Sequence, residues 1–473
     1  MKKDLRKTKI VATIGPASDS EEKLTELANA GFSVARINFS HGGYEENAEK
    51  ISNIKKVRSA LKKPISLLLD TKGPEIRTGK LESGDEKVVI NEGQEFTFIN
   101  EDIIGNETKT SISYKDLYKD VAPGAKILVD DGALEFEVIE IKEKDIVCKA
   151  LNTARLGSRK TVNIPGLKLN LPALSPKDIA DLTNGVKADF DFVAASFVRR
   201  VDDVQQIRKL LDDNGGQDIK IISKIESEEG VRNFEKILEI SDGIMVARGD
   251  MAVEIPAEQV PIVQKYFIKR CNEVGKPVIT ATQMLESMMQ NPKPTRAEVS
   301  DVANAVYDRT TAIMLSGECA LGKYPVVCVE TMDRISKAIE HDINYWKRFN
   351  EKCMVNSDED VEMTIATSSC VTAENTNATA IIAYAEKPEF AFKLASRGAK
   401  CPIFVTTTSE KTFHHLGIAW NITPILVKSA ENAIEEGIKI LKEQELLEEN
   451  DTVVIAGMKE QDRIVVSSVI KVK

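Results

Sequence analysis

The sequence lacks any apolar stretch long enough to cross a membrane. No uninterrupted apolar run approaches the roughly 20 residues that span a bilayer, and the basic stretch from Met1 to Lys9 leads into no apolar signal core. An excess of basic residues is also lacking, since 64 Lys and Arg stand against 74 Asp and Glu, a net charge of −10. This balance argues against a nucleic-acid surface. We therefore expect a cytoplasmic protein with neither a membrane nor a nucleic acid as partner.

Cysteine and histidine are too sparse and scattered to form a disulfide framework or a zinc cluster. The seven cysteines are odd in number and form no C-x-x-C pair, so buried reduced thiols are expected. The four histidines are spread along the chain and form no group that suggests a triad. The chain has no internal repeat and no low-complexity linker, and its 473 residues predict about three domains.

What the sequence does contain is an alternation of strand-like and helix-like segments. Apolar residues recur every three or four positions, the spacing of a helix, in stretches such as Ser20–Ala30, Val201–Leu211 and Val260–Val274. Eight β-branched runs alternate with such stretches, which predicts a (β/α)₈ TIM barrel with its active site at the C-terminal ends of the strands. The eight runs are Lys9–Gly15, Val34–Phe39, Ile65–Thr71, Phe190–Val198, Ile219–Glu226, Gly243–Asp250, Pro277–Gln283 and Ala312–Gly317.

Two further domains are expected outside the barrel, which itself is assigned to residues 1–72 and 170–344. Residues 73–169 carry β-like segments between Gly, Pro and Asp turns, which predict a small all-β domain inserted after the third strand. Such a domain would emerge beside the active site, where a mobile lid would lie. Residues 345–473 contain five more β-like runs and predict a separate α/β domain.

Two acidic residues close two consecutive predicted strands. Glu226 and Asp250 each have a cation two positions earlier, Lys224 and Arg248. Positions i and i+2 of a strand share a face, so both carboxylates and both cations are expected to converge. A surface ion pair is the alternative for Lys224 and Glu226, but their isoleucine-rich strand argues against it. The pattern predicts a Mg²⁺ site beside an anion site, and Gly249 is expected to expose a backbone N–H to an anion.

Polar residues also gather at the ends of the second and third predicted strands. Arg36, Asn38 and Ser40 share one face, which in an interior parallel strand should point into the barrel mouth. Arg36 has a planar guanidinium group that can bind a phosphate or carboxylate through two parallel hydrogen bonds. The oxygens of Asp70 and Thr71 are expected to lie beside those of Asn38 and Ser40. This cluster of oxygens has one formal negative charge, on Asp70, which suits a monovalent cation better than a divalent one.

Three other features also bear on the function. Thr282 ends the seventh predicted strand, where the barrel position favours a catalytic role over that of a simple strand former. His41 lies among the site residues and is interpreted as a nucleotide contact and not a base. A hydroxyl run in the last domain could hold a phosphate or could be an ordinary loop start, and both interpretations stay open. That run is Thr406, Thr407, Thr408 and Ser409.

Nine collinear segments make the sequence similar to the pyruvate kinase family, in a form without the additional C-terminal phosphohistidine-like domain of some bacterial relatives. The resemblance implies phosphoryl transfer from phosphoenolpyruvate to ADP, giving pyruvate and ATP, with Mg²⁺ (or Mn²⁺) and K⁺ as cofactors. It also implies a homotetramer in which the third domain supplies one interface. The segments are Lys9–Ser18, Ala35–Gly42, Leu69–Gly79, Ala195–Arg199, Ser223–Glu226, Gly243–Asp250, Thr282–Ser287, Pro294–Ala305 and Met314–Glu318.

The resemblance also implies a role for each matching residue. Lys224 matches the family's transition-state lysine, Thr282 matches the threonine implicated in enolate protonation, and Glu75 matches the glutamate of K⁺-dependent members. The Mg²⁺ ligands would be Glu226 and Asp250, and the K⁺ ligands Asn38, Ser40, Asp70 and Thr71. The substrate contacts would be Arg36, Lys224, Gly249, Asp250 and Thr282. No family role at the substrate transfers to Arg248, so a structural ion pair is expected for it. The nucleotide contacts would be Asn38, Phe39, Ser40, His41, Arg77 and Lys160.

Departures from the family pattern leave some points open. Thr161 replaces the glycine that usually follows Lys160, and Cys319 replaces a threonine, which we interpret as a packing change. Members activated by fructose 1,6-bisphosphate often carry a glycine-bearing loop near the C-terminus, where this chain has Gly457–Arg463. The existence and identity of a sugar-phosphate effector therefore stay open.

Two rival functions are weighed against the resemblance. A Mg²⁺-dependent aldolase or lyase of 2-oxo acids would explain Glu226, Asp250 and Arg36, but not the inserted domain or the nucleotide contacts Arg77 and Lys160. A non-catalytic sensor paralogue would not need the intact set of site residues.

Overall fold

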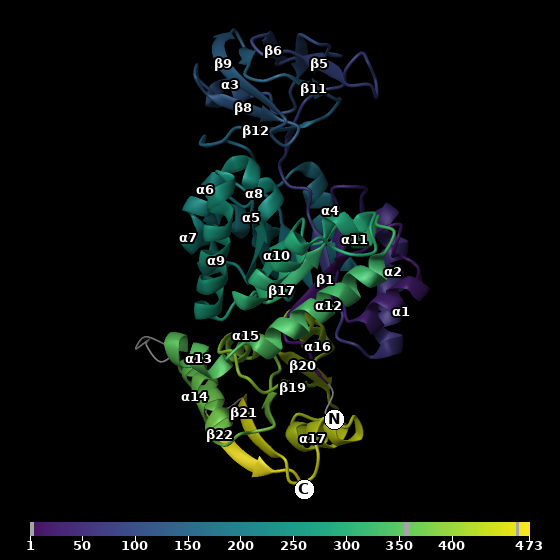
Figure 1. The fold of residues 1–473 in the computed structure, drawn as a ribbon, viewed down its shortest axis with the longest axis vertical. Helices are drawn as coiled ribbons and strands as arrows, with labels where there is room; N and C mark the ends of the chain where they lie inside the picture. The colour runs from purple at the N-terminus through teal and green to yellow at the C-terminus, as the bar shows by residue number, and fades with distance from the viewer. Residues whose placement is uncertain (1–3, 354–359, 460–462) are drawn as a thin grey trace.

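The molecule is a closed parallel barrel with one unit above it and one below it (Figure 1). We analysed a computed structural model that describes residues 4–353, 360–459 and 463–473. Eight strands close the barrel in the order β1-β17-β16-β15-β14-β13-β3-β2, which confirms the predicted (β/α)₈ fold. They are β1 (Lys9–Thr13), β2 (Val34–Asn38), β3 (Ser66–Asp70), β13 (Phe192–Ala195), β14 (Lys220–Ile225), β15 (Gly243–Ala247), β16 (Val278–Ala281) and β17 (Ala312–Leu315).

Helices surround the barrel because each strand buries side chains on both of its faces. One set of apolar side chains, including Val11 and Leu68, fills the barrel interior, and the alternate set, including Ile10 and Leu69, packs outward against the helices. The surrounding helices are α1 (Glu21–Ala30), α2 (Tyr44–Leu61), α4 (Pro176–Lys187), α5 (Val201–Asp213), α7 (Phe234–Ile240), α9 (Val260–Val274), α10 (Arg296–Tyr307) and α12 (Pro325–Asp342). Short helices α6 (Glu228–Arg232), α8 (Arg248–Glu254) and α11 (Gly317–Ala320) follow β14, β15 and β17.

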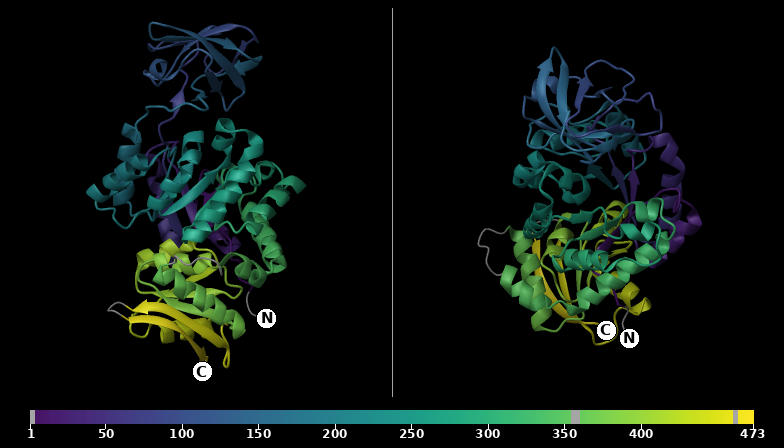
Figure 2. Two further views of the ribbon diagram at one scale, coloured as in Figure 1. Left: turned by 90° about the vertical axis from the view of Figure 1, so that its left-hand side faces the viewer. Right: turned by 45° about the horizontal axis from the view of Figure 1, so that its top comes forward.

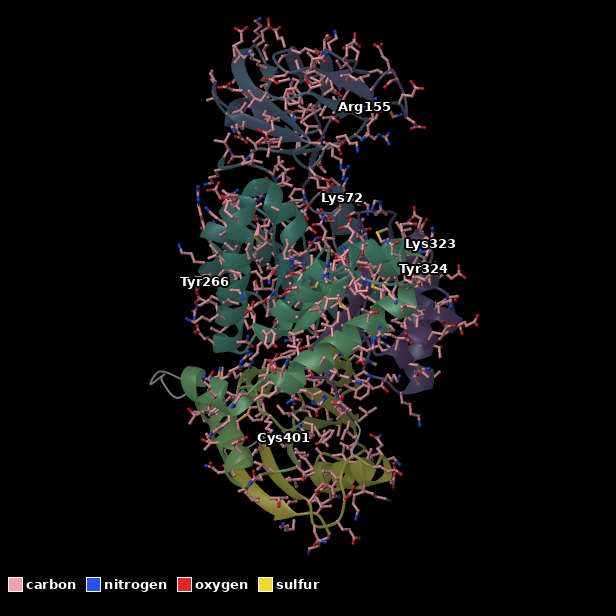
Figure 3. The ribbon with its side chains drawn as sticks, in the orientation of Figure 1. Lys72, Arg155, Tyr266, Lys323, Tyr324 and Cys401 are labelled. Atoms are coloured by element: carbon pink, nitrogen blue, oxygen red, sulfur yellow. The ribbon has the colours of Figure 1, made fainter. Side chains whose placement is uncertain are left out.

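The inserted unit between β3 and β13 is all-β apart from one helical turn, α3 (Leu117–Asp120). Its main sheet has the order β4-β12-β8-β9-β10-β6-β7, packed around Phe96, Phe98 and Phe136. Figures 1 and 2 show it standing above the strand ends, and Lys72, labelled in Figure 3, lies where the chain leaves the barrel. The strands are β4 (Ile76–Arg77), β5 (Val88–Ile90), β6 (Glu95–Ile99), β7 (Lys109–Ser111), β8 (Lys126–Val129), β9 (Leu134–Lys142), β10 (Asp145–Ala150), β11 (Ala154–Leu156) and β12 (Thr161–Asn163).

The C-terminal unit is a five-stranded sheet of order β20-β19-β18-β21-β22 with helices against it. Part of the predicted loop Gly457–Arg463 falls on residues 460–462, which lie outside the described residues. Among the described helices, none is long and apolar enough to cross a membrane. The elements are α13 (Tyr345–Cys353), α14 (Val361–Asn375), β18 (Ala380–Tyr384), α15 (Glu389–Ser396), β19 (Ile403–Thr407), α16 (Glu410–His415), β20 (Ile422–Leu426), α17 (Ala433–Glu443), β21 (Thr452–Lys459) and β22 (Arg463–Lys471).

Helix α16 of this unit contacts the underside of the barrel at the buried carboxylate of Asp191. Asp191, fully buried before β13, lies 2.9 Å from Arg58 of α2 and accepts the Leu67 N–H of β3 at 2.7 Å. From α16, Lys411 Nζ lies 3.4 Å from the same carboxylate, and the His415 ring lies 3.1 Å from the Asp191 carbonyl. The C-terminal unit therefore contacts the strand that ends at Asp70.

This interface predicts a loss of stability in mild acid. Burial lowers the pKa of His414 from 6.5 to about 4, so the unfolded chain takes up a proton before the folded chain does. Stability present above about pH 6.5 is then lost as the pH falls towards 4. We expect His414→Gln to reduce the fall in melting temperature over this range, by about 1 °C per kcal/mol recovered in a chain of 473 residues.

The measurement is differential scanning calorimetry between pH 4 and pH 8 on the whole chain. The matched control is His341→Gln, because His341 lies exposed near the end of α12. Equal acid sensitivity of wild type and His414→Gln would contradict the prediction.

Candidate active site

Lys224 lies at the centre of a buried charge cluster at the C-terminal ends of the barrel strands. Its ammonium group lies 3.0 Å from Asp70, 3.0 Å from Glu226 and 2.7 Å from the Ser196 hydroxyl. Burial alone would lower the pKa of Lys224, but Asp70 and Glu226 more than offset it, so the pKa lies above its ordinary value. Lys224 is therefore a fixed cation, and the expectation that it is not a surface ion pair is confirmed by its 9 % exposure.

Arg36 supplies a second cation to the same cluster, as its place on β2 predicts. Its Nε lies 2.6 Å from Asp70, and its guanidinium also donates to Thr13 at 2.8 Å. Burial would raise the pKa of Asp70, but Arg36 and Lys224 outweigh it and hold that pKa below its ordinary value. The alternate residues Ile37 and Phe39 point into the outer core, which confirms the predicted division of faces.

Glu226 and Asp250 form a pair of carboxylates that a divalent cation would stabilise. Glu226 is 1 % exposed, accepts the Phe197 N–H at 2.5 Å, and follows β14 directly. Burial and the charge of Asp250 raise its pKa to about 7 despite the nearby Lys224. Among the described residues no group of three or more His, Cys, Asp or Glu could hold a metal. Two carboxylates with room for water and substrate oxygens fit Mg²⁺.

The prediction that Arg248 and Asp250 share a strand face is wrong. β15 ends at Ala247, and Arg248 begins helix α8, so the two-residue repeat of a strand does not apply. Arg248 instead lies 2.6 Å from Asp301 and donates to the carbonyl oxygen of Thr282 at 2.6 Å. The structural ion pair expected for Arg248 is thus confirmed, and Lys224 and Arg36 are the cations of the cluster.

Thr282 and Gly249 contact each other at the ends of β16 and β15. The Gly249 N–H donates to the Thr282 hydroxyl at 2.9 Å, so the expectation of a free N–H at Gly249 is wrong in this structure. Thr282 has a φ of 71°, which a β-branched residue rarely adopts, and Phe197 after β13 has a φ of 54°. Such strain gathers at functional sites, where the surrounding structure holds it in place.

The four predicted ligands of a monovalent cation meet at the ends of β2 and β3. Asn38 and Asp70 are register partners, the Asn38 side chain accepts the Ser40 N–H at 3.0 Å, and Thr71 follows Asp70. One carboxylate among neutral oxygens is a donor set that fits a weakly held monovalent cation.

The predicted nucleotide contacts are divided between two units. Asn38, Ser40 and His41 lie at the barrel mouth, whereas Arg77 and Lys160 lie in the inserted unit, on β4 and before β12. Arg77 pairs with Glu75 at 2.8 Å, and Lys160 pairs with Asp130 at 2.8 Å. The Phe39 side chain is fully buried against Phe190. Its N–H donates to the Asp70 carbonyl at 2.9 Å and its carbonyl accepts from Lys177 at 2.8 Å, so only the second lone pair of that carbonyl is left for a ligand.

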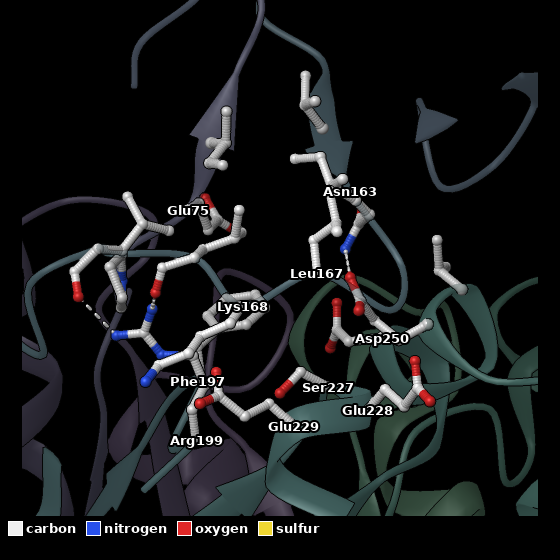
Figure 4. A pocket seen from close by; sticks show the side chains of 18 of the residues that line it. Glu75, Asn163, Leu167, Lys168, Phe197, Arg199, Ser227, Glu228, Glu229 and Asp250 are labelled. Carbon is white, nitrogen blue, oxygen red and sulfur yellow. Dashed lines mark hydrogen bonds between the residues drawn. The ribbon is translucent and has the colours of Figure 1, made fainter. Parts of the chain in front are cut away.

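A cleft of about 320 Å³ separates the inserted unit from the barrel (Figure 4). Asp250 of α8 lines this cleft. The Asn163 side chain of β12 extends across the cleft and donates a hydrogen bond to Glu254 of α8 at 2.8 Å. Thr161, the departure beside Lys160, bonds to Asp131 at 2.8 Å within the inserted unit. Cys319 is buried, with its sulfur 3.7 Å from the carbonyl oxygen of Pro325, which agrees with a packing change.

The hydroxyl run Thr406–Ser409 lies in the C-terminal unit, away from the cluster. The Thr406 and Thr407 side chains are buried, and Ser409 accepts a backbone N–H as the N-cap of α16. The Thr408 hydroxyl donates to Glu386 at 2.9 Å, which places a carboxylate where a phosphate would bind.

Sequence reasoning missed Ser196 and Phe197, the turn that follows β13. Ser196 contacts Lys224 through its hydroxyl, and Phe197 contacts Glu226 through its N–H. The available signal was a polar residue directly after Ala194 and Ala195 in a predicted barrel strand.

Comparisons with known proteins agree with this architecture. Residues 5–329 match the family model of the pyruvate kinase barrel domain, and residues 363–472 match that of the pyruvate kinase alpha/beta domain. The chain is 46% identical over 457 residues to a pyruvate kinase of Clostridium acetobutylicum, covering 96% of each chain. It is 49% identical over 424 residues to one of Staphylococcus epidermidis, covering 89% of this chain and 72% of the relative. A solved pyruvate kinase from Cryptosporidium parvum has a TM-score of 0.94 at 38% identity, covering 99% of this chain and 96% of that chain.

The carboxylate pair predicts a divalent-cation site that can be tested without turnover. Glu226→Gln and Asp250→Asn each remove one anionic oxygen donor, so we expect at least about tenfold weaker Mn²⁺ binding by electron paramagnetic resonance. Glu254→Gln on the same helix is the matched control and should keep wild-type affinity, because Glu254 points to Asn163. Wild-type Mn²⁺ affinity in both test variants would contradict the assignment.

Proposed function

This chain belongs to the pyruvate kinase family and has that family's phosphotransferase activity, and we propose that the cluster around Lys224 carries phosphoryl transfer from phosphoenolpyruvate to ADP, giving pyruvate and ATP. The observation that carries the proposal is the buried Lys224 ammonium held between Asp70 and Glu226. A phosphoryl group in transfer needs alignment and charge neutralisation more than covalent help. Lys224 offers a positive charge that is already fixed in place and needs no reorganisation when the charge develops.

The chain's other side chains have separate parts in this proposal. Arg36 binds an anionic group of phosphoenolpyruvate from the opposite side of Asp70. Asp250 of α8 and Thr282, which follows β16, contact the rest of the substrate. After transfer the product is an enolate, and the Thr282 hydroxyl passes a proton to it, either directly or through water, and regains a proton from solvent. Its strained backbone and its bond to Gly249 fix where that hydroxyl points.

Two cations complete the proposed site. Glu226 and Asp250 would hold Mg²⁺ or Mn²⁺, and Asn38, Ser40, Asp70 and Thr71 would hold K⁺, with Glu75 as in K⁺-dependent relatives. When bound, these ions supply positive charge between two polyanions that otherwise repel each other.

The inserted unit acts as a lid over this cluster. Arg77 and Lys160 bring cations from the lid to the phosphates of ADP, while Asn38–His41 contact the nucleotide from the barrel. Closure excludes water and so limits hydrolysis of the donor. The Asn163–Glu254 contact supports this part, because Glu254 lies on the same short helix as Asp250.

We also propose the wider arrangement that the family suggests. Residues 1–72 and 170–344 form the catalytic barrel, 73–169 the lid, and 345–473 the regulatory and interface domain of a cytoplasmic homotetramer. A sugar-phosphate effector would bind at Thr406–Ser409, provided that Glu386 moves away from Thr408.

The deciding assay is pyruvate formation from phosphoenolpyruvate with and without ADP, Mg²⁺ and K⁺. We expect product only when ADP and Mg²⁺ are present, and more product with K⁺. Product without ADP would favour a lyase instead, and no product under any condition would favour a sensor.

Removing the fixed cation should abolish most of the activity. Lys224→Met is expected to lower kcat by at least about 10²–10³-fold, the usual loss for one preorganised electrostatic donor. The matched control is Lys220→Met at the other end of β14, because Lys220 pairs with Glu389 on the underside. Near-normal turnover of Lys224→Met in a steady-state assay would refute the role of Lys224.

A further inference from the structure

The hydroxyl of Ser196 lies between the predicted K⁺ ligands and Lys224. Ser196 follows β13 directly, is 5 % exposed, and accepts a hydrogen bond from Lys224 Nζ at 2.7 Å. Its hydroxyl donates to the Thr71 carbonyl at 2.6 Å and lies 3.2 Å from the Asp70 carboxylate. Its own N–H donates to the Thr71 hydroxyl at 3.0 Å. One side chain therefore contacts both Asp70 and Thr71 on one side and the central cation on the other.

Lys224 depends on this hydroxyl for its position. An ammonium group has three N–H donors, and its three partners are Asp70, Glu226 and Ser196. Without the hydroxyl, the ammonium would be held by two carboxylates alone, and one donor would be left in a buried place. A bond to a charged group is stronger than a neutral one, so this loss is expected to move Lys224.

The turn that holds Ser196 is built to keep it in place. Phe197 has a φ of 54° and uses its N–H to bind Glu226 at 2.5 Å. Gly73, where the chain crosses into the inserted unit, packs against this turn, and a Cβ there would lie 2.8 Å from Ser196 Cβ. A side chain at position 73 would therefore displace Ser196.

We propose that Ser196 is a positioning residue that couples the monovalent-cation site at Asp70 and Thr71 to the placement of Lys224. The inference rests on the proposed function for the identity of the reaction. A cation bound to the oxygens of Asp70 and Thr71 changes the charge and direction of both groups that the Ser196 hydroxyl contacts. The hydroxyl carries that change to the ammonium, so K⁺ affects the alignment of Lys224 as well as the charge of the site.

The test is Ser196→Ala, with Ser223→Ala as the matched control. Ser223 is a fully buried serine on the neighbouring strand β14, and its hydroxyl pairs with Ser241 at 2.7 Å, away from the cluster. We expect Ser196→Ala to lower kcat about 10- to 100-fold, as for loss of one hydrogen bond to a charged group, and to raise the half-activating K⁺ concentration several-fold. Ser223→Ala should leave both quantities unchanged, even if its melting temperature falls.

A second readout needs no turnover and separates this inference from the proposed function. The melting temperature is measured against KCl at constant ionic strength, with choline chloride as the balancing salt. We expect wild type and Ser223→Ala to be stabilised by K⁺ and Ser196→Ala to lose most of that response.

Different results would contradict the coupling through Ser196 and the proposed function. A K⁺ response of Ser196→Ala equal to that of wild type, in activity or in melting temperature, would overturn the coupling, as would a wild type that does not respond to K⁺. If wild type makes no pyruvate, the proposed function fails, while the melting curves still decide whether Ser196 transmits the effect of K⁺.

Discussion

The burial of one ammonium group is the constraint on which the rest of this structure depends. A lysine at the end of a barrel strand stays charged only if carboxylates and hydrogen-bond acceptors surround it. Asp70, Glu226 and Ser196 supply them from three neighbouring strands, and Arg36 then balances Asp70. Replacing a charged residue at one strand end therefore alters the charge balance of the residues at the neighbouring strand ends.

The barrel makes this arrangement possible because all of its parallel strands end at one rim. Residues distant in the chain, such as Asp70 and Lys224, meet there without a dedicated loop. The same geometry lets short segments after the strands adjust the site, as the strained turn at Phe197 does for Glu226. The inserted unit contacts α8 above this rim through Asn163 and Glu254, and α16 contacts β3 from below through the His414 carbonyl and Ser66.

Much of the fold could be predicted because its patterns are local. The eight observed barrel strands fall within the predicted runs, and α9 has the predicted bounds. The predicted shared strand face of Arg248 and Asp250 is wrong because an apolar pattern does not separate a strand from the first turn of a helix that follows it directly. The ion pair expected for Arg248 is confirmed by its contact with Asp301. The predicted free N–H of Gly249 is wrong for a related reason, because this N–H donates to the hydroxyl of Thr282, which follows another strand. Ser196 was missed because its importance comes only from contacts across the barrel.

The sequence by itself determined the alternation of strands and helices, the family, and which residue types stand at the strand ends. Strand and helix periodicity, like short collinear motifs, depend on neighbours within a few residues. Tertiary structure alone decided how charges pair. Arg248 turns away to Asp301, Lys224 lies among Asp70, Glu226 and Ser196, and the cations of Arg77 and Lys160 stand in a separate unit. The physical reason is that charge pairing and burial depend on distances between segments far apart in the chain, which no local pattern records.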